Sequence, residues 1–148
     1  MKARLEFVFG MLVATIFPSM AQLLPATEKV AVRREMIEKD IAIRNLASII
    51  ALGAEKELMY QLSQLSEYQM LSHPQLREPF ERVLAQWKKK GVEKYFTSLQ
   101  KTAQNLKALL ASQDKSKLWE KMAEGYQAIL ADCRFCHETL QVEVGEGN

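Results

Sequence analysis

The only two cysteines of the chain lie in one pentapeptide near its C-terminus, Cys133-Arg134-Phe135-Cys136-His137. This Cys-x-x-Cys-His pattern is typical of covalent haem attachment. On a helix, residues three and four apart share a face, so Cys133, Cys136 and His137 point the same way. The two thiols can then form thioethers with the porphyrin vinyl groups while the adjacent imidazole reaches the iron.

The same face of this helix is also its apolar face. Arg134 and Phe135 point elsewhere. At about 100° per residue, eight side chains lie within about 60° of one direction: Leu118, Met122, Tyr126, Ile129, Cys133, Cys136, His137 and Leu140. The spacing therefore predicts that the haem ligands enter the protein core, where a pocket can form.

Three other interpretations of the pentapeptide compete with haem attachment. A thioredoxin-like dithiol needs a βαβ context in which the motif opens a helix, whereas this motif ends one. A zinc site needs four ligands, and only His73 and His137 accompany the thiols, so carboxylates would have to complete it. A Cys133–Cys136 disulfide suits an oxidising compartment but leaves His137 without a role. Haem attachment is the favoured hypothesis.

The composition favours helices to position this motif. The 148 residues are 48% apolar and 26% charged, with only six Gly and four Pro. Ala, Leu, Glu, Lys and Gln dominate, and these residues favour helix. We expect an all-α, antiparallel four-helix bundle in a single domain, because short turns join neighbouring helices.

Breaks in the sequence divide the chain into helices. Gly53, Pro74 and Gly91 mark ends, and Asp114 is a plausible N-cap for the last helix. A stripe from Val92 to Leu110 has the spacing of a helix that faces a bundle core. The predicted helices cover residues 27–52, 54–71, a connecting segment 75–90, 92–110 and 115 to about 141.

The N-terminus has the layout of a cleaved signal peptide. Lys2 and Arg4 precede an apolar run that ends at Phe17, and Ser19 and Ala21 are small residues suited to a cleavage site. We expect residues 1–21 to be removed, residues 22–148 to form the mature domain, and the protein to be periplasmic. The apolar run is too short to span a bilayer, so no stable membrane insertion is expected after cleavage.

Charge gives little sign of a polyanionic partner. The net charge is +2, and it falls to +1 without residues 1–21. Lys88-Lys89-Lys90 is the only basic run, and such a run is usually a solvated face, although it could help to dock an acidic redox partner. Nothing suggests nucleic acid as a partner.

A helical chain of this length with Cys-x-x-Cys-His near its C-terminus resembles the class II c-type cytochromes, the cytochrome c′ family. The resemblance covers the mature chain and is strongest from Phe96 through Leu140. It implies one covalently attached haem c between the helices of the bundle, with His137 as axial iron ligand. Leu140 and Gln141 depart from the family, which often has an aromatic and a basic residue at these two positions.

The resemblance also implies a residue of the first helix on the open side of the haem. Met36 is the candidate sixth ligand, near the centre of a stripe formed by Val32, Met36, Ile43, Ala47 and Ile50. A core role for Met36 is one alternative; in another register of the first helix, aligned on an arginine, Ile37 or Glu38 would occupy this position. Arg33 could contact a haem propionate or simply be solvated. A second histidine ligand would have to be His73, which lies in a loop beside Pro74.

These residues predict a one-electron carrier rather than an enzyme, with redox proteins as partners and a homodimer as an open alternative. If Met36 does not bind the iron, the open position could bind nitric oxide or carbon monoxide. The third alternative is a haem-free helical bundle with a disulfide between Cys133 and Cys136.

Overall fold

The computed structural model describes residues 24–140, and within this range every regular element is helical. The predicted signal peptide, residues 1–21, lies outside the described residues. The prediction of an all-α fold is confirmed. The elements are α2 (Ala26–Leu52), α3 (Glu55–Ser66), the 3₁₀ turn η1 (Gln69–Ser72), α4 (Arg77–Lys89), α5 (Glu93–Ala111) and α6 (Leu118–Leu140).

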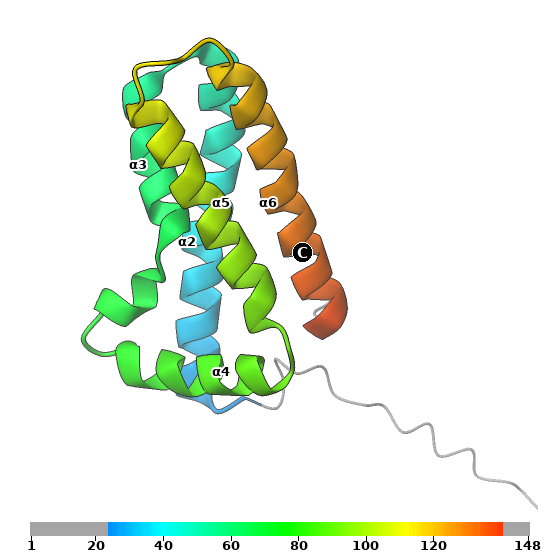
Figure 1. The fold of residues 1–148 in the computed structure, drawn as a ribbon. Helices are drawn as coiled ribbons and strands as arrows, with labels where there is room; N and C mark the ends of the chain where they lie inside the picture. The colour runs from blue at the N-terminus through cyan, green and yellow to red at the C-terminus, as the bar shows by residue number, and fades with distance from the viewer. Residues whose placement is uncertain (1–23, 141–148) are drawn as a thin grey trace, which may run out of the picture.

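Four of the helices run side by side in alternating directions (Figure 1). α2 packs against α3, α3 against α5, and α5 against α6, whereas α6 packs back on α2 more sparsely. The shorter α4 lies across the end of the bundle where α5 begins and α6 ends (Figure 1). We call the sparse contact between α2 and α6 the α2–α6 seam.

The bounds of α2 and α4 to α6 are close to those predicted, and local chemistry explains them. Gly53 ends α2 in the left-handed conformation, with φ of 68°, which glycine adopts at low cost. Gly91 follows α4 with φ of 69°. Asp114 accepts a hydrogen bond from the Ser116 backbone N–H at 3.0 Å, so it caps the turn that precedes α6 rather than α6 itself.

The predicted end of the second helix at residue 71 is wrong. α3 ends at Ser66, Glu67 is extended, and η1 follows. Lys39 of α2 donates hydrogen bonds to the carbonyl oxygens of Gln64 and Glu67, and so occupies acceptors at the end of α3. Glu35 accepts the Met70 backbone N–H at 2.9 Å. These bonds from α2 replace the bonds that a longer α3 would have made.

The core has two parts along the bundle. One part lies between α2, α3, α5 and α6 and is mainly aliphatic. The other lies toward α4 and is aromatic, with Trp87 stacked on Phe96 at a ring-centroid distance of 4.8 Å and an interplanar angle of 11°. Cys136 and Leu140 belong to this second part, so the end of α6 is packed into it.

α4 is tied to the start of α2 by charge as well as by packing. Arg82 of α4 donates to the Glu28 carboxylate at 2.6 Å, and this hydrogen bond holds the pKa of Glu28 below its usual value. Within residues 24–140, no helix is long and apolar enough to cross a membrane.

Candidate functional site

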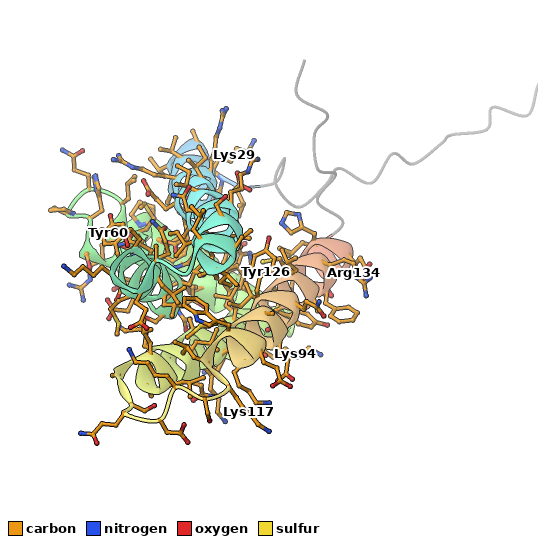
Figure 2. All side chains as sticks on the ribbon, turned by 90° about the horizontal axis from the view of Figure 1, so that it is seen from above. Lys29, Tyr60, Lys94, Lys117, Tyr126 and Arg134 are labelled. Carbon is orange, nitrogen blue, oxygen red and sulfur yellow. The ribbon has the colours of Figure 1, made fainter. Side chains whose placement is uncertain are left out.

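The last turns of α6 present the pentapeptide as its spacing predicts. Cys136 is buried, Cys133 and His137 are half-buried, and Arg134 and Phe135 are exposed. The predicted inward direction of Cys133, Cys136 and His137 is therefore confirmed. Of the eight residues predicted to share this face, the half-buried ones are Tyr126, Cys133 and His137. Tyr126 extends between α6 and α2 in Figure 2, whereas Arg134 points out from the bundle.

Two cavities lie beside these side chains. The first has a volume of about 30 Å³ and the second about 80 Å³. Both are walled by Met36, Phe96, Cys136 and His137. The first is completed by Lys39, Tyr95, Leu99, Asp132 and Cys133, and the second by Val32, Trp87 and Leu140.

The structure thus brings four of the five predicted site residues together. Cys133, Cys136 and His137 come from α6, and Met36 reaches the same space from α2. Arg33 does not line either cavity: it is exposed on α2, three residues before Met36. Because the α2–α6 seam is sparsely packed, this is where residues of both helices can border an open space.

His137 shares one feature with His73, a buried Nδ1 atom without a hydrogen-bond partner among the described residues. Buried polar atoms are nearly always hydrogen-bonded, since leaving one unpaired costs about 1–3 kcal/mol. An imidazole in this situation is suited to a ligand that orients or engages the ring.

His73, the other histidine, lies elsewhere. Its Nε2 is 3.4 Å from Nη1 of Arg34, and it lines neither cavity. The fold therefore does not place His73 and His137 on opposite sides of one binding site.

Both cysteines are free thiols with raised pKa values. Burial, followed by the carboxylates of Asp132 and Asp40, raises the pKa of Cys133 to about 11. Burial and the neighbouring Cys133 raise the pKa of Cys136 to about 12. The thiolate is the reactive form in disulfide exchange, and redox-active cysteines have lowered pKa values. The raised pKa values of Cys133 and Cys136 instead disfavour the reactive thiolate.

The buried face of α2 differs from the predicted one. The predicted stripe around Met36 is half-buried throughout. The fully buried face is rotated from it and consists of Glu28, Ala31, Glu35, Lys39, Ala42 and Leu46. α3, η1 and α4 cover this face, so the Met36 stripe is left beside the α2–α6 seam.

Sequence reasoning missed the pair Glu35 and Lys39. Their side chains are 0% and 5% exposed, and Lys39 Nζ lies 3.1 Å from Glu35 Oε1. Burial lowers the pKa of Lys39, while Glu35 opposes that shift. The four-residue spacing of opposite charges, in phase with Ala31, Ala42 and Leu46, was the signal that could have found this pair.

Among residues 24–140, no three His, Cys, Asp or Glu side chains form a group that could hold a metal ion. Comparisons of the chain with protein-family models, curated proteins and solved structures found no match.

Proposed function

We propose that this chain is an exported, mono-haem c-type cytochrome that transfers one electron at a time to and from redox partner proteins. Haem c would supply that chemistry, because its iron changes between the ferric and ferrous states. Cys133 and Cys136 would hold the haem covalently, and His137 would be the axial iron ligand. The proposal rests on one observation: Met36, Cys136 and His137 line both cavities, with Cys133 beside them in the first.

The donor set and its surroundings fit a haem c. The thiols and the imidazole project from consecutive turns of one helix, and all three line the first cavity. The cavity walls are mostly apolar and include Phe96 and Trp87, which suits the faces of a porphyrin. At the outer edge of the Met36 stripe, exposed Arg33 has donors available for a propionate.

The two cavities are too small to hold a porphyrin without movement of the side chains around them. Their volumes, about 30 and 80 Å³, are well below the roughly 300 Å³ of the smaller ligand pockets. Cavity-lining side chains such as Met36 and Trp87 must therefore move apart to admit a porphyrin. Among the neighbouring pairs of the four helices that run side by side, α2 and α6 have the sparsest contact, so separating them disturbs the least packing within the bundle.

Met36 decides between two forms of this function. If its thioether is the sixth ligand, the iron is closed to small molecules and the protein is an electron carrier. If Met36 is only a cavity wall, the open position can bind nitric oxide or carbon monoxide, which is the second candidate function. We favour the carrier because Met36 borders both cavities together with His137.

The remaining alternative is a haem-free bundle with a structural or redox-active Cys133–Cys136 disulfide, and the raised thiol pKa values argue against the redox-active form. A dithiol catalyst needs an accessible thiolate. Here burial keeps both thiols protonated at neutral pH.

The test is expression of the full chain in cells that attach haem to exported proteins. After denaturation, haem staining on a gel should follow the polypeptide, and Cys133→Ser/Cys136→Ser should abolish the stain. His137→Ala should change the absorption spectrum, whereas the matched variant His73→Ala should leave it unchanged. A wild-type chain that is exported and folded but carries no covalent haem would disprove the proposal.

A further inference from the structure

Two aromatic rings, each with a cation over it, form a surface beside the cysteines. The ring of Phe135 on α6 stacks with that of Tyr95 on α5, with centroids 6.0 Å apart and an interplanar angle of 23°. Lys94 Nζ lies 5.0 Å from the Tyr95 centroid, and Arg134 Cζ lies 5.0 Å from the Phe135 centroid. We call Lys94, Tyr95, Arg134 and Phe135 the aromatic–cation patch.

The patch connects the surface with the candidate site. Tyr95 is half-buried and lines the first cavity together with Cys133 and His137. Phe135, stacked on Tyr95, is 41% exposed. Arg134 and Phe135 are the two residues between the cysteines, so the segment that would hold the haem also forms part of the surface. The patch therefore joins an exposed ring, that of Phe135, to a residue that lines the first cavity, Tyr95.

Charges of both signs lie around the patch, with basic side chains in excess. Lys88, Lys89 and Lys90 are exposed at the end of α4, immediately before α5 begins at Glu93. The acidic residues nearby are Glu138, whose carboxylate lies 3.6 Å from Arg134, Glu93, which precedes Lys94, and Asp132, which lines the first cavity with Tyr95. Aromatic and arginine side chains are enriched at the centres of protein interfaces, and surrounding charges steer the approach of a partner.

We propose that the aromatic–cation patch is the docking surface for an acidic redox protein, and that electrons enter and leave through it. This inference rests on the proposed function. The partner would carry carboxylates around its own redox centre to complement Lys94 and Arg134, and an apolar contact for Phe135. The step is a one-electron exchange, in which the iron of one protein is oxidised as the centre of the other is reduced.

The test measures oxidation of the reduced, haem-loaded protein by two small reagents of opposite charge, the hexacyanoferrate(III) anion and the tris(phenanthroline)cobalt(III) cation. Each takes one electron. At low ionic strength, Lys94→Gln/Arg134→Gln should slow the reaction with the anion by about tenfold and should not slow the reaction with the cation. Added salt should reduce the difference between variant and wild type.

The matched control is Lys115→Gln/Lys117→Gln, in the turn immediately before α6 begins. It removes the same charge, and Lys115 is paired with Glu55 much as Arg134 is paired with Glu138. Equal slowing by the two double variants would overturn the inference but leave the proposed function intact. A chain that takes up no haem would remove both.

A second measurement does not depend on electron transfer. The redox-inert, paramagnetic hexacyanochromate(III) anion should broaden the amide resonances of Lys94, Tyr95, Arg134 and Phe135 before those near Lys117. Broadening centred elsewhere would overturn the assignment. Binding to phosphatidylglycerol vesicles that is lost in Lys94→Gln/Arg134→Gln would do so as well, because the patch would then face a membrane.

Discussion

Met36 of α2 and His137 of α6 border the same two cavities, although they lie near opposite ends of the described chain. The relationship depends on the antiparallel order of the helices, which returns the end of α6 to the first half of α2 (Figure 1). Replacing Met36 therefore tests whether its thioether would bind an iron held by His137.

If Met36 binds the iron, the ferric protein should have low-spin absorption bands with a methionine-to-iron charge-transfer band. Met36→Ala should abolish that band while leaving the haem covalently attached. Met122→Ala is the matched control, because Met122 is fully buried on α6 and lines neither cavity. High-spin bands and rapid nitric oxide binding in the unaltered protein would favour the second candidate function instead.

Lys39→Met should destabilise the fold strongly. The substitution leaves the Glu35 carboxylate, which is 0% exposed, without its cation, and it leaves two carbonyl oxygens at the end of α3 without a donor. Breaking one partner of a buried ion pair typically costs about 3–5 kcal/mol. The loss should appear as a lower urea midpoint with an unchanged slope.

Two further variants identify the cause of this loss of stability. Lys39→Met/Glu35→Gln removes the unpaired charge and should recover part of the stability, since Gln can still accept the Met70 N–H. Lys115→Met breaks an exposed pair with Glu55 and should cost no more than about 1 kcal/mol. If Lys39→Met were as mild as Lys115→Met, the pair would not hold α2 to α3.

The raised thiol pKa values predict slow alkylation of the haem-free, folded chain. At neutral pH, a pKa of about 11 instead of 9.0 lowers the thiolate fraction of Cys133 about 100-fold, and Cys136 should be slower still. Iodoacetamide labelling in buffer and in denaturant measures the ratio. Similar labelling rates in buffer and in denaturant would show that the two thiols at the end of α6 are accessible in the folded chain.

The same shifts give a pH dependence of stability with a defined sign. Between pH 9 and about 11 the folded chain keeps thiol protons that the unfolded chain releases, so the free energy of unfolding should fall as the pH rises. Cys133→Ser/Cys136→Ser should lose this part of the slope. Lys39, whose pKa is lowered by burial, contributes with the opposite sign, and its coupling to Cys133 makes this contribution differ between the two proteins.

Gly125→Val should weaken the contact between α5 and α6. A Cβ at Gly125 would lie 2.6 Å from Leu106 Cδ1, and Leu106 is itself buried. Overpacking of this kind costs about 1–3 kcal/mol. Ala123→Val, at an exposed position of the same helix, should show only the small propensity cost of a β-branched residue. Equal urea midpoints for the two variants would contradict the close approach.

The helices and the direction of the pentapeptide could be predicted because they depend on local patterns. Gly53 and Pro74 mark breaks within a few residues, and the spacing of Cys133, Cys136 and His137 fixes their common direction on α6. Both features follow from helical geometry without knowledge of which helices are neighbours.

The end of α3 and the buried face of α2 could not be found in this way. α3 stops at Ser66 because Lys39, 25 residues before Gln64, takes acceptors at its end. The rotation of α2 depends on the same contact, since burial of the Glu35–Lys39 pair against α3 turns Met36 toward the α2–α6 seam. A hydropathy pattern counts charged residues as exposed, so it selects the neighbouring apolar stripe.

The α2–α6 seam also has a consequence for the order of folding. α2 with α3, α3 with α5, and α5 with α6 are near neighbours along the chain, whereas the seam joins its two ends and closes the longest loop. We expect the seam to close last, and amide hydrogens on its two sides to exchange earliest among those of the long helices. The α2–α6 seam therefore closes the ring of helices last, and the pentapeptide lies in this seam.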